Sequence, residues 1–394
     1  MNTIEQFNEH VMQTYGRIGL VMESGHGQTA VGEDGKEYID FGSGIGTNSL
    51  GYCDEDWVNA ICDQAHKIQH TSNYYYTKVQ ADFAKRLCEA TGYEKMFFGN
   101  SGAEANECAI KLARKYSFDK YGKDAERNII ITLVNSFHGR TLCTLSATGQ
   151  EVFHNYFFPF VSGFENVIAN DIDDLMDKLN KLDNKVCAVM FEFVQGEGGV
   201  IPLQQSFVNT IMLECAKRDI LTIADEVQTG VGRTGKLLTS ELYNVKPDIT
   251  TLAKGLAGGV PIGVCLANKK CIEVLGKGTH GSTFGGNPIS CAGGNAVLDK
   301  VTKPEFLEEV RKKGEYFREK LVQIDEVEGV DGLGLMIGVR LKTKKAADVL
   351  NKCFENGLLI LTAKDKLRFL PPLNISYEQI DKGLAILKKV LDEK

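Results

Sequence analysis

Two charged residues near the middle of the chain each stand at the end of an apolar run. Asp225 ends the run in ILTIADEV, and Lys254 follows the run in DITTLAKG. Parallel strands bring their carboxyl ends to one edge of a sheet, where α/β proteins bind ligands, so both side chains could face one site. Burial lowers the pKa of a lysine from about 10.4 and makes its amine a nucleophile that can form an imine. Alone, Asp225 could instead pair with an arginine or cap a helix.

Three glycine-rich segments could each bind a phosphate. DFGSGIGTNSLG has G-x-G-x-G spacing and continues with residues that begin a helix poorly, which argues against a dinucleotide site. GVGRTGKL places Leu237 where a P-loop requires a hydroxyl. GNSGAEANE leads into a helical pattern, so the N–H groups of Gly102 and Ala103 could hold a phosphate at a helix N-terminus. A simple strand-to-helix turn would have the same sequence.

The aspartate, the lysine and the helix N-terminus together suit pyridoxal 5'-phosphate (PLP), which needs one group for each of its polar ends. Asp225 would keep the pyridine nitrogen protonated, so that the ring withdraws electrons. Lys254 would hold the aldehyde as an imine and then move a proton between the substrate carbon and the cofactor. We therefore predict Lys254 and Asp225 as catalytic residues, with Gly102 and Ala103 at the phosphate.

Short apolar runs that alternate with amphipathic helices must position these residues. The runs are KMFFG, RNIIITLV, KVCAVMFEFV, DILTIADEV, DITTLAKG and IGVCLA. Continuous apolar strands separated by helices predict an α/β fold with a mostly parallel mixed sheet flanked by helices. Long charged helices around a few short strands follow, and they predict a smaller C-terminal α+β domain.

This change of rhythm divides the chain into three parts. We expect residues 1–45 to form an N-terminal segment that packs on the small domain or on a partner subunit, and Asp34-Gly35 predicts a hairpin turn within it. We expect residues 46–294 to form the large, PLP-binding domain and residues 295–394 to form the small C-terminal domain.

Composition excludes several classes of protein. The 394 residues are 43 % hydrophobic and 25 % charged, which is typical of a globular protein of two or three domains. A formal net charge of −7 argues against a nucleic-acid partner or a polybasic membrane patch. The eleven cysteines are scattered without C-x-x-C pairs, so we expect no metal site and no disulfide framework. Because the sequence shows neither an export leader nor an apolar run near eighteen residues, we expect a cytoplasmic protein that neither spans nor binds a membrane.

Six segments resemble those of the class III PLP-dependent aminotransferases of fold type I, in the same order and with similar gaps. They are GNSGAEANE, SFHGRT, FVQGEGG, ADEVQTGVGRTG, TTLAKGLAGGVPIG and HGSTFGGNP. The resemblance covers essentially the whole chain. It implies fold type I, in agreement with the α/β pattern, and PLP as the cofactor.

Within this class, HTSNYYYTKVQADFAKRL and LRFLPPL are most similar to the acetylornithine aminotransferases, whereas FHGRT also occurs in 4-aminobutyrate enzymes. The resemblance implies transamination of N2-acetyl-L-ornithine with 2-oxoglutarate, which gives N-acetyl-L-glutamate 5-semialdehyde and L-glutamate in arginine biosynthesis. Ornithine, succinylornithine and 4-aminobutyrate aminotransferases are the near alternatives. A non-catalytic PLP-binding regulatory protein is the remote one.

The resemblance also implies further cofactor contacts. Phe137 would stack on one face of the ring, and Val227 would press on the other. Gln228 would reach the side of the phenolic oxygen, and Glu226 is included among the cofactor-binding residues. Thr283 would add a hydroxyl to the phosphate of the other subunit, so the active unit would be a homodimer with shared sites.

The implied substrate contacts come from four segments. Arg140 would offer a planar, bidentate donor to the substrate α-carboxylate. Ser282 would approach the substrate beside Thr283. Glu197 would neutralise Arg368 in one half-reaction and release it to bind the second carboxylate of 2-oxoglutarate in the other.

Overall fold

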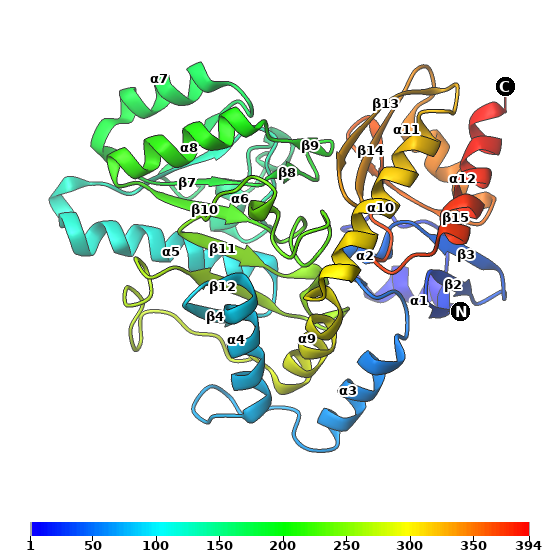
Figure 1. Cartoon of the computed structure of the whole chain (residues 1–394), viewed down its shortest axis with the longest axis horizontal. Helices are drawn as coiled ribbons and strands as arrows, with labels where there is room; N and C mark the ends of the chain where they lie inside the picture. The colour runs from blue at the N-terminus through cyan, green and yellow to red at the C-terminus, as the bar shows by residue number, and fades with distance from the viewer. Residues whose placement is uncertain (1, 394) are drawn as a thin grey trace.

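The structure, a computed structural model, describes residues 2–393, and this part of the chain forms two lobes (Figure 1). The larger lobe contains a seven-stranded sheet. In spatial order its strands are β4 (Lys95–Gly99), β12 (Gly263–Ala267), β11 (Ile249–Leu252), β10 (Leu221–Asp225), β7 (Val186–Phe191), β5 (Ile129–Leu133) and β6 (Phe164–Val167). Strand β12 runs antiparallel to β4 and β11, and the other neighbours are parallel. The predicted α/β class with a mostly parallel mixed sheet is confirmed.

Helices cover both faces of this sheet (Figure 1). The helices that precede the second lobe are α1 (Thr3–His10), α2 (Ser43–Gly46), α3 (Glu55–Ala65), α4 (Lys78–Thr91), α5 (Gly102–Tyr121), α6 (Leu142–Ala147), α7 (Ile172–Leu182), α8 (Gln205–Arg218) and α9 (Pro288–Val301). Helix α5 packs on one face, with Ala109 and Leu112 in a core that includes Ile223. Helices α7 and α8 pack on the other face, in a core that includes Phe191 and Ala224. Burial on both faces explains why the strands are continuous apolar runs.

Alternation along β10 determines where the acidic residues at its end point. Ile223 faces the α5 side and Ala224 faces the α7 and α8 side, so Asp225 again faces α5. In the parallel pairing with β11, Asp225 lies beside Thr251. Lys254 lies three residues after Thr251, at the same edge of the sheet, where the 3₁₀ turn 254–257 begins.

The smaller lobe contains an antiparallel sheet. Its strands, in spatial order, are β13 (Val327–Leu333), β14 (Met336–Leu341), β17 (Lys366–Phe369) and β16 (Leu361–Ala363). Its helices are α10 (Pro304–Leu321), α11 (Ala346–Glu355) and α12 (Tyr377–Asp392). This arrangement confirms the smaller C-terminal α+β unit.

A third sheet combines strands from the N-terminal part of the chain with one strand from the C-terminal part. It consists of β1 (Met22–His26), β2 (Thr29–Gly32), β3 (Glu37–Asp40) and β15 (Leu358–Leu359). Gly35, with φ +78°, lies in the turn between β2 and β3, where the sequence predicts a hairpin. Strand β15 pairs with β3 in parallel, and Figure 1 shows both termini beside the smaller lobe. The domain boundaries at 45 and 294 stay a prediction.

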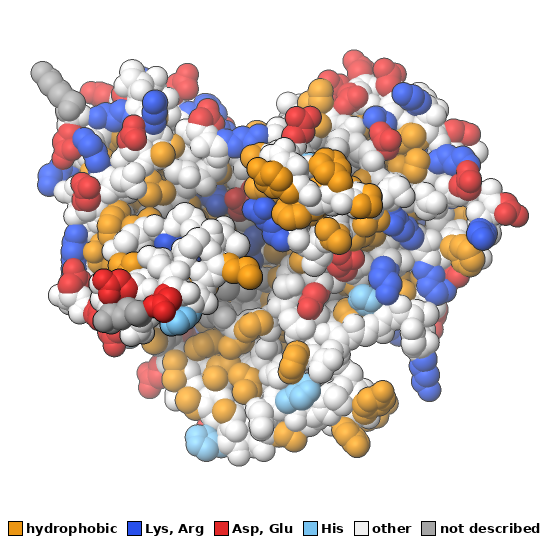
Figure 2. All heavy atoms as spheres, turned by 180° about the vertical axis from the view of Figure 1, so that it is seen from behind, with side chains coloured by type: hydrophobic (Ala, Val, Ile, Leu, Met, Phe, Trp, Pro, Cys, Tyr) orange, Lys and Arg blue, Asp and Glu red, His pale blue; other side chains and the backbone are white. Residues whose placement is uncertain are grey.

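Short elements complete the fold. A two-stranded ribbon is formed by β8 (Val194–Gln195) and β9 (Ile201–Pro202), and the 3₁₀ turns are η1 (Lys123–Ala125), η2 (Glu151–Phe153), η3 (Asp183–Lys185), η4 (Thr239–Glu241) and η5 (Lys254–Ala257). Seen from behind, the molecule is hollowed between its lobes, with cationic and acidic side chains inside the hollow (Figure 2). Every helix in residues 2–393 is too short or too polar to cross a lipid bilayer.

Candidate active site

A cavity of about 390 Å³ opens at the edge of the large sheet where β10 and β11 end. Nine of the residues predicted from the sequence line it: Gly102, Ala103, Phe137, Arg140, Glu197, Asp225, Val227, Gln228 and Lys254. They come from the start of α5, from the loop after β5, from the β8–β9 connection and from the ends of β10 and β11. Residues that are distant in the sequence therefore meet in one concave site.

Lys254 has two features that are unusual for a lysine. Its backbone adopts φ +40°, a left-handed conformation that costs a non-glycine residue on the order of 1–3 kcal/mol. Desolvation lowers the pKa of Lys254 below its ordinary value, although the carboxylates of Glu197 and Asp225 oppose this effect. The amine is therefore more readily neutral, and hence nucleophilic, than a surface lysine.

Asp225 is held by three donors and is only 4 % exposed. Its Oδ2 accepts from His138 Nδ1 and from Asn106 Nδ2, each at 2.8 Å, and its Oδ1 accepts from the Val227 N–H at 3.0 Å. Asn106 Oδ1 in turn accepts from Thr251 Oγ1 at 2.7 Å. Because Asn106 is itself anchored and Val227 donates from the backbone, the carboxylate presents a fixed acceptor to the cavity.

The start of α5 leaves room for an anion. Ser101 caps the helix by accepting from the Glu104 N–H at 3.2 Å, while the first N–H groups of a helix have no partner within it. A Cβ at Gly102 would lie 2.7 Å from Val227 Cγ1, so only glycine allows the helix to approach Val227 this closely. Gly102 and Ala103 lie in the cavity wall with this positive helix end.

Two aromatic rings surround the cation of Arg140. Phe137 and Phe153 meet edge to face with centroids 6.0 Å apart, and the Arg140 guanidinium lies 3.9 Å from the Phe153 centroid. Arg140 has no carboxylate partner within residues 2–393. Its fork can therefore receive a carboxylate from a bound molecule.

A buried carboxylate lies behind Phe137. Glu192 Oε2 accepts from the Phe137 N–H at 3.1 Å. Desolvation raises the pKa of Glu192 well above its ordinary value, and repulsion from Asp225 adds to this rise. The raised pKa of Glu192 favours its neutral form, which reduces the repulsion that Glu192 exerts on the Asp225 carboxylate.

Glu197 and Arg368 form the predicted ion pair. Arg368 Nη1 lies 2.6 Å from Glu197 Oε1, and the arginine side chain is 4 % exposed. Burial alone would raise the pKa of Glu197, but the charge and the hydrogen bond of Arg368 lower it below its ordinary value. Glu197 lines the cavity, whereas Arg368 on β17 lies outside its wall. The carboxylate thus covers the arginine.

The structure corrects the assignment of Glu226. This side chain is fully buried and lies away from the cavity, where it accepts from the N–H groups of Thr239 at 2.6 Å and Ser240 at 3.0 Å. Desolvation raises its pKa to about 7, and these donors oppose the rise. Alternation along the strand turns Glu226 to the side opposite Asp225, so it stabilises the loop that carries Thr239 instead of contacting a cofactor.

Ser282 and Thr283 lie in a separate cavity of about 1150 Å³. Asn100 connects the two sites, because it lines the active cavity and its Nδ2 donates to Ser282 Oγ at 3.1 Å. The assignment of Ser282 and Thr283 to the site of another subunit stays a prediction.

Sequence reasoning missed three of the polar residues of the site, which are His138, Asn106 and Glu192. Asn106 lies four residues after Gly102 and so shares its helix face, a signal that the sequence contained. His138 follows Phe137 directly, but only the fold shows that its ring meets Asp225. The same holds for Glu192, which reaches the site from β7.

The residues of the cavity fit PLP. A fixed carboxylate, a desolvated lysine and a helix N-terminus meet the three polar ends of the group. Gln228 Oε1 is buried and has no donor within residues 2–393, so a polar atom of a bound ligand could satisfy it. The geometry therefore agrees with the cofactor indicated by the sequence.

Comparisons with known proteins give a consistent result. The family model for class III aminotransferases matches residues 11–391. The acetylornithine aminotransferase of Haemophilus ducreyi is 52 % identical over 385 residues, which cover 98 % of this chain and 97 % of that protein. The acetylornithine aminotransferase of Caldanaerobacter subterraneus subsp. tengcongensis is 47 % identical over 390 residues, 98 % of each chain.

Solved structures agree in fold. The N-acetylornithine aminotransferase from Stenotrophomonas maltophilia K279a is 34 % identical, with a TM-score of 0.85 and 98 % of both chains covered. An ornithine aminotransferase from Toxoplasma gondii is 31 % identical, with a TM-score of 0.93 over 98 % of this chain and 93 % of that chain. Crystallized in the presence of oxidized glutathione, that protein has PLP at partial occupancy in its active site.

Proposed function

The chain belongs to the class III aminotransferases, which use PLP, and from this premise we propose that it transfers the δ-amino group of N2-acetyl-L-ornithine to 2-oxoglutarate. The products would be N-acetyl-L-glutamate 5-semialdehyde and L-glutamate, as a step of arginine biosynthesis in the cytoplasm. The observation that carries the proposal is the meeting of Lys254, Asp225 and the start of α5 in one cavity. Relatives of 47 % and 52 % identity that are acetylornithine aminotransferases support this amino donor.

We assign the chemistry to two residues of this chain. When bound, PLP supplies an aldehyde and a ring that withdraws electrons from the substrate carbon. Lys254 Nζ would take the proton from that carbon in the half-reaction with the amino donor. It would give a proton to the corresponding carbon in the half-reaction with 2-oxoglutarate, since its lowered pKa suits both transfers. Asp225 would hold the ring nitrogen in its charged form, and His138 and Asn106 would keep its carboxylate in place.

We assign substrate binding to the two arginines. Arg140 would bind the carboxylate that both substrates share. Arg368 would bind the second carboxylate of 2-oxoglutarate after Glu197 turns away, and Glu197 would cover it when the first substrate is bound. One cavity could then accept two molecules of different charge.

We also propose a homodimer with shared sites. Ser282 and Thr283 lie outside the active cavity of their own chain, and the large aromatic side chains of Tyr74, Tyr75 and Tyr76 are exposed beside that second cavity. A contiguous exposed apolar surface is typical of an interface. Light scattering would measure the mass, and a monomer with full activity would contradict this part of the proposal.

A panel of amino donors tests the proposed reaction. With 2-oxoglutarate as acceptor, we expect N2-acetyl-L-ornithine to give the highest kcat/KM, above ornithine, succinylornithine and 4-aminobutyrate. Each donor should also bleach the visible absorbance of the PLP-loaded enzyme in the absence of acceptor. A higher kcat/KM for another donor would overturn the substrate only. Absence of bleaching with every donor would overturn the transaminase mechanism.

A further inference from the structure

A second cavity, of about 400 Å³, lies along the C-terminal half of α5. One wall is a single face of the helix, because Lys111, Arg114, Lys115 and Phe118 follow the i, i+3, i+4, i+7 spacing. The other wall is the segment 122–128 that leads into β5. At about 1.5 Å per residue, Phe118 lies about 24 Å along the helix from Gly102. This cavity is therefore separate from the active site.

Positive charge dominates the wall of this second cavity. Five cations line it, namely Lys111, Arg114, Lys115, Lys123 and Arg127, against the single carboxylate of Glu126. Glu126 is already paired with Lys185 at 2.9 Å, and Lys115 is paired with Asp119 at 2.6 Å. The other four cations have no carboxylate partner within residues 2–393. In a chain of net charge −7, this excess is local and unbalanced.

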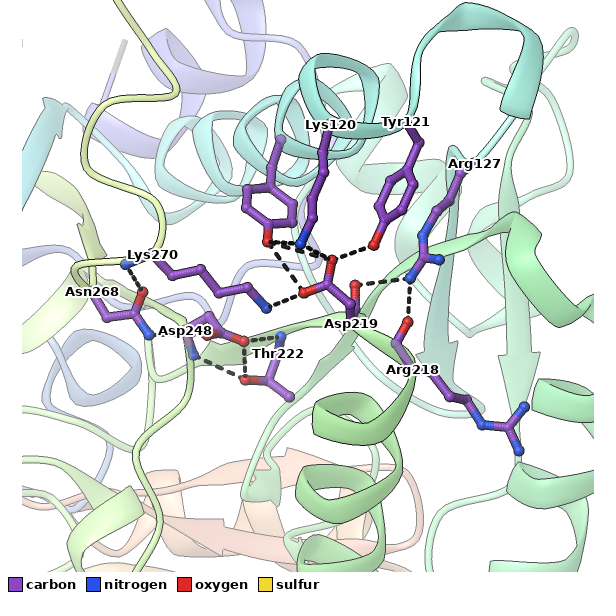
Figure 3. A network of polar contacts seen from close by, with 10 residues as sticks. Lys120, Tyr121, Arg127, Arg218, Asp219, Thr222, Asp248, Asn268 and Lys270 are labelled. Atoms are coloured by element: carbon purple, nitrogen blue, oxygen red, sulfur yellow. Dashed lines mark hydrogen bonds and ion pairs between the residues drawn. The ribbon is translucent and has the colours of Figure 1, made fainter.

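Arg127 is held in place without being neutralised (Figure 3). It is 8 % exposed, its Nη2 donates to the carbonyls of Arg218 at 2.7 Å and Asp219 at 2.8 Å, and its guanidinium lies 4.5 Å from the Tyr121 centroid. The Asp219 carboxylate is occupied by Lys120 at 2.8 Å and by other donors. Arg127 Nε is buried and has no acceptor among the described residues.

Arg114 repeats this arrangement on the helix. Its Nη2 donates to the Ser162 carbonyl at 2.8 Å, and its guanidinium lies 5.0 Å from the Phe164 centroid. Its Nε is also buried and without an acceptor in residues 2–393. Carbonyls and rings orient a guanidinium but leave its charge uncompensated, and a partly buried charge without a counter-ion is costly. An anion from solution would remove this cost.

The negative end of the α5 dipole does not explain the cluster. That end acts within the last turn of a helix, where Lys120 already lies. Lys111, Arg114 and Lys115 lie about 1.4 to 2.5 turns before Lys120. A different requirement must therefore place these cations on one face.

We propose that this second cavity binds a small phosphate-bearing anion. Arg114 and Arg127 use Nη2 for carbonyls, so each keeps Nη1 without an acceptor among the described residues, and this N–H group can donate a charge-assisted hydrogen bond to a phosphate oxygen. Lys111, Lys115 and Lys123 add positive charge around it. Phe118 is 55 % exposed at the wall and offers an apolar surface to a heterocycle. The volume lies within the range of sites for small molecules, which favours a nucleotide or an inorganic phosphate over a polymer.

Calorimetric titration of the PLP-loaded enzyme tests this proposal, because the cofactor then fills the first phosphate site. Pyrophosphate and ADP are titrated separately at low ionic strength. We expect both to bind, and we expect the double variant Lys115→Gln/Lys123→Gln to weaken binding at least about tenfold. The matched control Lys85→Gln/Lys303→Gln removes two exposed lysines that do not line this cavity and should leave the affinity unchanged. Thermal unfolding of each variant verifies that it is folded.

The comparison of the two ligands identifies the source of the phosphate. Tighter binding of ADP than of pyrophosphate, with the difference lost in Phe118→Ala, would indicate a nucleotide. Equal affinities would indicate a site for the phosphate group alone. No binding of either ligand at millimolar concentration, or equal binding by the double variant, would overturn the proposal. The readout is affinity, so it does not depend on the amino donor proposed above.

Discussion

The charged residues near the two ends of α5 differ in whether they have partners of opposite charge. At the N-terminal end, the active cavity places Lys254 near the carboxylates of Glu197 and Asp225, and Arg368 is paired with Glu197. Along the C-terminal half, Arg114 and Arg127 are held by carbonyls and rings instead. Balanced charges allow small changes of environment to control where a proton resides. Unbalanced charges instead favour an ion that arrives from outside.

The largest effect should follow from removal of the Lys254 amine from the active cavity. In Lys254→Ala we expect turnover to fall by at least about 10⁴-fold, since the same atom is proposed to bind the cofactor and to move the proton. The visible absorbance of bound PLP should change as well. Steady-state kinetics and a visible spectrum measure both effects. Lys85→Ala, an exposed lysine of α4, is the control, and an active Lys254→Ala enzyme would end the proposed mechanism.

The second largest effect should come from the charge of Asp225. Asp225→Asn keeps the shape of the side chain but removes its charge, so we expect kcat to fall roughly 10²–10³-fold while PLP still binds. Glu226→Gln is a sharp control, because it changes the adjacent buried carboxylate on the other side of the strand. Its activity per folded molecule should stay the same. Equal losses in both variants would show that burial, and not contact with the cofactor, explains the effect.

A smaller effect is expected when the ion pair between Glu197 and Arg368 is removed. In Glu197→Gln the neutral amide no longer balances the charge of Arg368. We therefore expect the rate of the half-reaction with 2-oxoglutarate to rise about tenfold relative to the rate of the half-reaction with the amino donor. Single-turnover measurements of each half-reaction give the ratio. Equal losses in both would contradict the proposed exchange of partners.

The contrast between the two cavities also explains what the sequence could predict. The ends of apolar strands located Asp225 and Lys254, because strand direction and alternation are local properties. The same alternation separates Glu226 from Asp225, and the structure turns Glu226 away from the cavity, although the resemblance places it at the cofactor. His138 reaches Asp225 from 87 residues away, a contact that only packing creates.

The second cavity could not be read from the sequence for a related reason. Lys111, Arg114 and Lys115 look like the solvated face of a helix, and such faces are usually just that. They become a cavity only because the segment 122–128 folds back over them. Asp219, which anchors that region, is distant in the sequence from both parts.

The smallest effect, on stability alone, is expected at Asp219 (Figure 3). Burial would raise the pKa of Asp219, but hydrogen bonds from Lys120, Tyr121 and Lys270 outweigh it and hold this pKa below its ordinary value. A carboxyl with a lowered pKa stabilises the fold above its unfolded pKa, near 3.9, and loses this contribution as the pH falls through the folded value. The backbone there has φ +52°, which asparagine tolerates.

We therefore expect Asp219→Asn to lower the free energy of unfolding by about 1–3 kcal/mol at pH 7, with turnover unchanged. The difference from the unsubstituted protein should shrink as the pH falls below about 4, because the unfolded chain then takes up a proton at this carboxyl while the native carboxylate stays charged. It should disappear once the pH has passed the lower pKa of the folded state. Urea unfolding at several pH values measures this trend. Asp119→Asn, which removes an exposed carboxylate of α5, should cost less than about 1 kcal/mol. A difference at Asp219 that stays constant with pH would mean that the network acts through shape, and the contrast in charge between the two ends of α5 would then lose its support at this end.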